Sequence, residues 1–168
     1  MSALLRTLRC RCGSVLCEAE GAPILTAVCY CADCQAGGRR LEALTGAGDV
    51  LESDGGASYL TYRDDRFRVI RGAEVLQGHK LRDTAPTQRF VATCCNSAIY
   101  LKFRPGHWVS LFRNRFDDAD LPAIEMRTNI RHRAADTPLP GDAPAYRRFP
   151  PRLFLRLIRA RLEMALGR

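Results

Sequence analysis

The sequence predicts a mainly β fold of short antiparallel strands with an α-helix at its C-terminal end. Segments rich in β-branched and aromatic residues alternate with Gly, Pro, Asp and Asn turn residues, which is typical of short strands. The clearest helical pattern begins only after residue 151. A chain of 168 residues, of which 46% are hydrophobic, can bury the core of one domain, and no apolar run approaches the roughly 20 residues of a membrane-spanning helix. We therefore expect one globular domain that does not span a membrane.

The β-rich segments give the expected positions of the strands. They cover residues 22–30, 57–62, 66–70, 89–94, 97–103, 107–116 and 123–133. A helical segment is expected over residues 34–46, although Gly37 and Gly38 weaken helix formation near its start. Trp108 is expected to anchor the core where its strand begins.

The composition changes near residue 135. Residues 136–151 carry five prolines and cannot form a regular element, so we expect a linker there. Residues 152–168 follow as a basic amphipathic helix, with prolines at its entry and Gly167 at its end. The predicted organisation is a β-rich domain over residues 1–135, then the linker, then the helix.

The C-terminal helix carries its charge on a narrow stripe. With a rotation of about 100° per residue, one narrow stripe of the helix surface holds Arg152, Arg156, Arg159 and Glu163. Arg161 alone interrupts the apolar side. One interpretation is that the helix packs on its own domain or on a second copy of the chain, which would make a homo-oligomer. The other is that it lies as a peripheral element on an anionic membrane surface.

The net charge of +8 is concentrated near the C-terminal end. Residues 147–168 contain seven arginines against one acidic residue, and the rest of the chain is close to balanced. Because the basic excess belongs to one segment, the net charge is only weak evidence for nucleic-acid binding, and we do not expect a nucleic-acid partner. No export signal precedes the first cysteine, so we expect a cytoplasmic, reducing compartment in which eight cysteines serve as metal ligands or free thiols.

Two cysteine motifs lie in the first part of the chain. The stretch CRCG places Cys10 and Cys12 on the same face of an extended segment, and the glycine after them suits a tight turn at a metal. The stretch CYCADC brings Cys29, Cys31 and Cys34 to one point through a short loop, and three soft sulfurs favour Zn²⁺ over harder metals. Cys17, by contrast, is expected as an inert thiol in the core.

The adjacent pair Cys94 and Cys95 lies in the stretch RFVATCCNSAIY. Together with CRCGSV and CYCADC it resembles the glutathione-dependent formaldehyde-activating enzyme family, which also includes centromere protein V. The resemblance covers roughly residues 8–130 and depends on the matching order of seven cysteines.

The resemblance implies a zinc-bound β-tent fold with two metal sites. The first and third motifs would form a structural site from Cys10, Cys12 and the 94–95 region. The middle motif would form a second site from its three thiolates, with one position open for chemistry. The resemblance also implies a carbon–sulfur lyase activity on adducts of glutathione with aldehydes, such as S-hydroxymethylglutathione, so that glutathione would be a co-substrate.

The chain departs from the family pattern at three places. The third motif of the family has a cysteine three residues before its second cysteine, and this chain has Cys94 beside Cys95 instead. We expect Cys95 to be a ligand and Cys94 to complete the site only if the backbone leaves strand geometry there. Asn96 replaces a family glycine and tolerates a left-handed backbone, while Tyr30 stands where the family has His or Asn.

The sequence leaves two function classes open. One is a zinc enzyme that acts on a small thiol or thiol adduct, for which the residues identify no general base, since the three histidines are expected to be structural or surface residues. The other is a non-catalytic, zinc-stabilised module that binds a protein, a membrane surface or nucleic acid. The three histidines are His79, His107 and His132.

Overall fold

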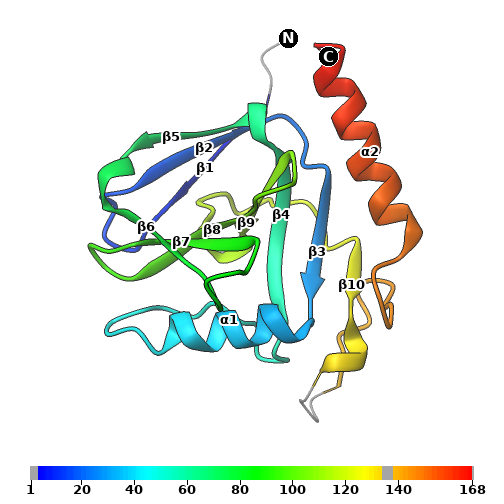
Figure 1. The fold of residues 1–168 in the computed structure, drawn as a ribbon, viewed down its shortest axis with the longest axis horizontal. Coiled ribbons are helices and arrows are strands. Elements are labelled where there is room, and N and C mark those ends of the chain that lie inside the picture. The colour runs from blue at the N-terminus through cyan, green and yellow to red at the C-terminus, as the bar shows by residue number, and fades with distance from the viewer. Residues whose placement is uncertain (1–3, 134–137, 168) are drawn as a thin grey trace.

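The computed structural model describes residues 4–133 and 138–167. Within them the strands form two sheets, in agreement with the predicted mainly β fold (Figure 1). The smaller sheet has the order β1-β2-β5, with β1 at Leu5–Arg9, β2 at Leu16–Glu20 and β5 at Phe67–Arg71. The larger has the order β10-β3-β4-β9-β8-β7-β6. Its strands are β3 (Leu25–Cys29), β4 (Ala57–Arg63), β6 (Leu76–His79), β7 (Thr87–Ala92), β8 (Ser97–Phe103), β9 (Trp108–Phe112) and β10 (Met126–Thr128).

Most neighbouring strands pair antiparallel, as the sequence predicts. The exception is β10, which runs parallel to β3 with Thr128 beside Cys29. Strand β10 is shorter than the strand expected over residues 123–133. It ends at Thr128 because Asn129 has a left-handed backbone and a short 3₁₀ turn follows. Strands β1, β2 and β6 lie outside the segments from which strands were predicted.

The hydrophobic core divides into three clusters. The first lies between the two sheets and includes Leu8, Leu60 and Leu111, all fully buried. It also contains Cys17, and burial raises the pKa of this thiol to about 12, which agrees with its expected inert role. The second cluster lies between the larger sheet and the first helix, and the third lies beneath the C-terminal helix.

Helix α1 covers Ala32–Glu42 and so begins and ends earlier than the predicted range. Its two central glycines are explained by close packing. A Cβ atom on Gly37 would lie 2.3 Å from Nε of Arg89, and one on Gly38 would lie 2.3 Å from a methyl carbon of Leu51. The low helix propensity at these positions is therefore offset by an approach that only glycine permits.

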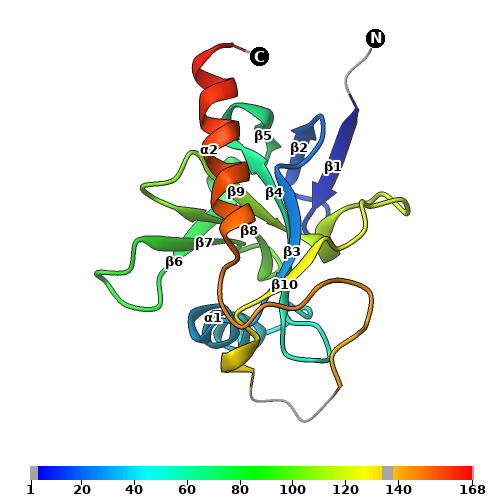
Figure 2. The same ribbon diagram turned by 90° about the vertical axis from the view of Figure 1, so that its right-hand side faces the viewer.

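Helix α2 covers Pro151–Ala165 and lies along β3 and β10 (Figures 1 and 2). Its buried side chains, Leu153, Leu157 and Ala160, face the body of the protein, and the first two pack with Leu25 and Met126. Trp108 is half-buried at the border of this cluster and stacks on Phe103, with 5.8 Å between the ring centroids. Among the described residues, no helix has the length and apolarity needed to cross a membrane.

The segment expected as a linker contacts the sheet edge over part of its length. The backbone N–H of Tyr146 donates to the carbonyl of Arg127, and that of Arg127 donates to the carbonyl of Pro144. Residues 136 and 137, at its predicted start, and residue 168, at the predicted end of the helix, lie outside the described residues. The division into three segments stays a prediction.

Candidate metal centres

The turn after β1 presents two of the predicted ligands. Gly13, with φ +79°, lets the chain reverse there, and its N–H donates to the carbonyl of Cys10 at 3.0 Å. The backbone N–H of Val15 points back and donates to the Cys10 Sγ at 3.2 Å. Cys10 is thereby fixed in the core, while Cys12 is exposed at the tip of the turn.

The β7–β8 hairpin presents the adjacent pair. Strand β7 ends at Ala92, so Cys94 and Cys95 lie in the turn and not in strand geometry. The N–H of Cys95 donates to the carbonyl of Ala92, and Asn96 has φ 52°, the left-handed conformation that an asparagine tolerates. The condition on which Cys94 was expected to join the site is therefore met.

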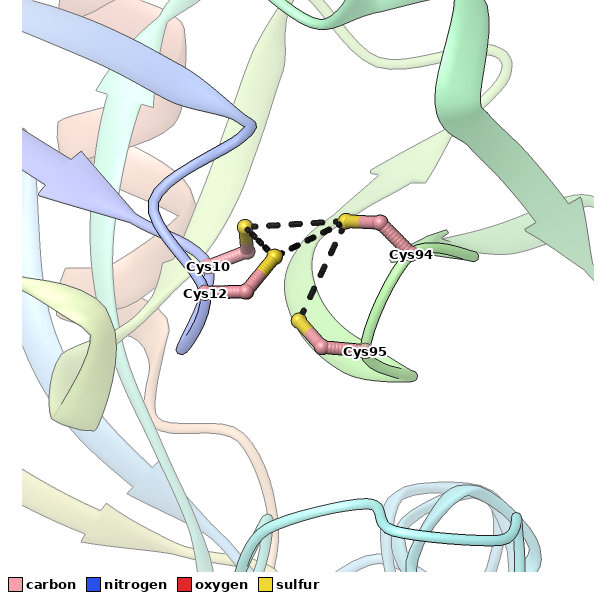
Figure 3. A group of neighbouring side chains, drawn as sticks. All are labelled: Cys10, Cys12, Cys94 and Cys95. Atoms are coloured by element: carbon pink, nitrogen blue, oxygen red, sulfur yellow. Dashed lines mark hydrogen bonds between the residues drawn. The ribbon is translucent and has the colours of Figure 1, made fainter.

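The two turns bring four sulfurs together, as Figure 3 shows. We call Cys10, Cys12, Cys94 and Cys95 the hairpin cluster; their Sγ atoms all lie within 4.8 Å of one another. The Sγ of Cys94 lies 3.8 Å from that of Cys10, 3.3 Å from that of Cys12 and 4.0 Å from that of Cys95. Four thiolates around one zinc at about 2.3 Å would be about 3.8 Å apart. The donor set and its spacing thus fit a tetrahedral metal ion.

The thiols of the hairpin cluster differ in pKa because their hydrogen bonds and burial differ. The Ser14 hydroxyl and backbone lower the pKa of Cys12 to about 6. Burial alone would raise the pKa of Cys95, but hydrogen bonds from Ser97 lower it. Desolvation, together with the nearby sulfur of Cys12, raises the pKa of Cys94 to about 12. A divalent cation would stabilise these thiols as thiolates, so metal binding here would release protons.

The second group of sulfurs lies where β3 meets α1. We call Cys29, Cys31 and Cys34 the helix cluster; their Sγ atoms also lie within 4.8 Å of one another. Cys29 is the last residue of β3, Cys31 caps α1 by accepting the Cys34 N–H at 3.3 Å, and Cys34 lies in the first turn. The positive end of a helix dipole favours thiolates at this position.

Two side chains from elsewhere in the chain contact the helix cluster. The Tyr59 hydroxyl on β4 donates to the Cys34 Sγ at 3.8 Å, and the Asn129 amide donates to the Cys29 Sγ at 3.6 Å. Burial holds the pKa of Tyr59 well above its usual value, so the hydroxyl keeps its proton and acts as a donor. Both contacts would stabilise charge on sulfur.

The three thiols of the helix cluster differ in their ionisation. Hydrogen bonds from Cys31 and Cys34 hold the pKa of Cys29 well below its usual value. The hydrogen bond to Cys29 raises the pKa of Cys31 to about 11, and hydrogen bonds to both neighbours raise that of Cys34 well above normal. The cluster therefore accommodates one thiolate by itself and would need a cation to ionise the other two.

A buried polar network fixes the loop that carries the helix cluster. The Tyr30 hydroxyl donates to Asp54 at 2.7 Å, and the Arg127 guanidinium contacts both Tyr30 and Asp54. Arg127 also forms a two-point ion pair with Asp142, at 2.9 and 3.0 Å. Tyr30, which stands where the resembled family has His or Asn, thus has a structural role between two predicted ligands.

The structure brings the seven predicted ligands into two groups, each of which could hold a metal ion. Sequence reasoning missed Tyr59 and Asn129, because no local motif marks them. Within the described residues, neither group includes a histidine. His107 contacts the carbonyl of Leu157 through Nε2 at 2.7 Å, and His132 accepts a hydrogen bond from Arg131.

No curated protein matches the chain at a significant level. Among solved structures, the crystal structure of a Rhodobacter sphaeroides protein from a structural genomics programme is similar, at 20% sequence identity and a TM-score of 0.49. The match covers 68% of this chain and 90% of that one. Over residues 1–163 the sequence matches a family described as a family of unknown function, DUF6151. With nearly its whole length matched, the chain belongs to the DUF6151 family.

Proposed function

We propose that this protein binds two zinc ions, a structural ion in the hairpin cluster and a second ion in the helix cluster that leaves one position for a small thiol or thiol adduct. The observation that carries the proposal is the difference in donor number between the clusters, four sulfurs against three. A structural zinc site is closed by four protein ligands, whereas a catalytic site keeps one position for substrate.

Zinc fits both donor sets because soft thiolate ligands select it over hard cations such as Mg²⁺ or Ca²⁺. In the hairpin cluster, Cys10 is buried and Cys12 is exposed, so the site lies at the surface with its inner ligand anchored in the core. In the helix cluster, Cys29 is buried, while Cys31 and Cys34 are partly exposed. That partial exposure would give a small molecule access to the ligands.

The proposed reaction joins a thiol to an aldehyde or separates the two. With glutathione and formaldehyde, a carbon–sulfur bond forms while the thiol proton is transferred to the carbonyl oxygen, and the reverse reaction breaks that bond. When bound, zinc supplies a Lewis acid that lowers the pKa of a thiol or polarises an oxygen. The order of the seven cysteines, which resembles the glutathione-dependent formaldehyde-activating enzymes, supports this substrate class.

The residues of the helix cluster would prepare the site for such a substrate. Cys29, Cys31 and Cys34 would act as ligands and not as nucleophiles. The donors from Tyr59 and Asn129 would reduce the charge on two of the sulfurs and keep them in place. The network of Tyr30, Asp54 and Arg127 would hold the loop rigid while substrate exchanges.

The proposed activity is tested by mixing zinc-loaded protein with glutathione and formaldehyde and following adduct formation by NMR. The wild type should accelerate the approach to equilibrium over buffer, and Cys31→Ser should not. Cys17→Ala is the matched control, because it removes a cysteine outside both clusters, and it should keep the activity. If a protein carrying two zinc ions gives no acceleration, the lyase proposal is wrong for this substrate, and a non-catalytic zinc module is favoured.

A further inference from the structure

Helix α2 presents an apolar face to solvent in addition to the face that it buries. Five large apolar side chains on this face are each more than half exposed, and they span an arc of about 120° opposite the buried side. They are Phe154, Leu155, Ile158, Leu162 and Leu166. Phe149, just before the helix, extends the face by an edge-to-face contact with Phe154, with 6.3 Å between the ring centroids. A monomeric protein rarely leaves a contiguous apolar surface of this kind without a partner.

The helix is held firmly while it presents this face. The Leu157 carbonyl contacts Nε2 of His107 at 2.7 Å, and Arg156 forms an ion pair with Glu125 at 2.5 Å. Arg152 donates to the carbonyl of Glu125 and lies 4.9 Å from the centre of the Tyr146 ring. The apolar face is therefore a fixed surface of the folded protein.

An apolar groove runs beside this face. It has a volume of about 300 Å³ and lies between α2 and the start of β9. Its lining is mostly apolar, with Trp108, Phe154, Ile158 and Leu162 among the lining residues, and it also includes His107 and Arg161. The groove extends the apolar face toward the body of the protein.

Arginines border the apolar face on both sides. At about 100° per residue, Arg161 falls on one flank and Arg152 and Arg159 on the other. Arg147 and Arg148 are exposed just before the helix. In the described part of the chain, Arg147, Arg148 and Arg161 form no ion pair, whereas Glu163, the single acidic residue of α2, pairs with Arg159.

We propose that this face of α2 docks on an anionic lipid bilayer. The charge pattern favours an anionic bilayer over a second copy of the chain. Two copies of the chain packed through α2 would bring their arginine borders together, and the single acidic residue of the helix, Glu163, is already paired with Arg159, so like charges would meet, which is unfavourable. An anionic bilayer instead offers acyl chains to the apolar side chains and phosphates to the guanidinium groups at its surface. The helix would lie flat, with its buried face still on the sheet.

The test is flotation of the full chain with vesicles of phosphatidylcholine and phosphatidylglycerol in equal parts, compared with phosphatidylcholine alone. Binding should occur on the anionic vesicles only and weaken as salt is added. Leu155→Ser combined with Ile158→Ser should reduce binding about tenfold or more, because these side chains would enter the bilayer. Arg147→Gln, Arg148→Gln and Arg161→Gln should each reduce binding about fivefold.

Ile70→Ser is the matched control, because Ile70 is an isoleucine of similar exposure, 49% against 57% for Ile158, and lies on β5, away from α2 (Figure 1). It should bind as the wild type does, and circular dichroism should show every variant folded. The proposal is wrong if the wild type does not bind anionic vesicles, or if the α2 substitutions leave binding unchanged. A dimer that the Leu155 and Ile158 substitutions dissociate, with no vesicle binding, would assign the face to a second copy instead.

Discussion

The Sγ atoms of Cys12 and Cys94 lie 3.3 Å apart, although 82 positions separate the two residues in the chain. Cys12 belongs to the turn between β1 and β2 in the smaller sheet, and Cys94 to the β7–β8 hairpin of the larger one. A metal ion held by the hairpin cluster would therefore join the two sheets, so the stability of the fold should depend on it.

Cys94→Ser should lower the free energy of unfolding by more than about 4 kcal/mol, the range that loss of a metal site reaches. Urea unfolding with and without a chelator measures this effect. The chelator should destabilise the wild type strongly and the variant only weakly, whereas Cys17→Ala should keep the chelator sensitivity. A variant as stable as the wild type would exclude Cys94 from the site.

Asn96 should contribute through its backbone conformation. Its φ of 52° is left-handed, and its side chain also donates to the carbonyl of Thr45 at 2.9 Å. Asn96→Ala and Asn96→Gly both lose that hydrogen bond, so the difference in their stabilities measures the cost of the left-handed backbone conformation. The alanine variant should be less stable than the glycine variant by about 1 kcal/mol in thermal unfolding. Equal stabilities would mean that the turn relaxes to another conformation.

Tyr59→Phe should weaken zinc binding at the helix cluster by about tenfold, because it removes the hydrogen bond to the Cys34 sulfur. Competition with a chromophoric chelator gives the affinity, and the absorption spectrum of the cobalt-substituted protein reports the change at sulfur. Tyr62→Phe is the control: Tyr62 is also a buried tyrosine of β4, but it packs in the core between the two sheets. An equal loss in both variants would indicate a general effect on folding.

Asp142 should stabilise the protein in a pH-dependent way. Its hydrogen bonds and ion pair with Arg127 lower the pKa of the carboxyl below its usual value. A lowered pKa means that the contribution is complete above about pH 4 and is lost as the pH falls through the value in the folded state. Because Asp142 is 46% exposed on its side chain, Asp142→Asn should cost at most about 1 kcal/mol at neutral pH.

Urea unfolding of the wild type and Asp142→Asn across the acidic range checks this prediction. The two proteins should converge in stability as the pH falls. A difference that stays constant would show that Asp142 acts through packing or through its neutral hydrogen bonds.

The sequence predicts the ligands of a site well when they lie close together along the chain and poorly when they lie far apart. Cys29, Cys31 and Cys34 lie within six residues, so their spacing alone places three sulfurs at one point. Pairing the distant Cys95 with Cys10 required the family resemblance. Tyr59 and Asn129 could not be predicted, because strand pairing across β3, β4 and β10 brings them to the cluster and no local pattern encodes that pairing.

The fold, too, is predicted from the sequence where a local pattern marks an element, and not where the structure depends on contacts between distant segments. Alternating β-branched and aromatic residues predict β4 and β8 well, and the proline entry predicts the start of α2 within one residue. The strand expected over residues 107–116 begins as predicted but is too long, because β9 ends at Phe112 and a 3₁₀ turn over Arg113–Arg115 follows it. Strands β1 and β2 have only five residues each, of which two are charged, so their sequences resemble surface segments. The parallel pairing of β10 with β3 depends on the path of the chain between them, which composition does not reveal.

The proposal that the chain binds two zinc ions is tested most directly by the metal content of the purified protein, measured by elemental mass spectrometry. The wild type and Cys17→Ala should each carry two zinc ions per chain. Cys12→Ser and Cys31→Ser should each carry one, and the double variant none. A wild type without bound metal, or variants that keep both ions, would contradict the assignment of the two cysteine clusters as metal centres.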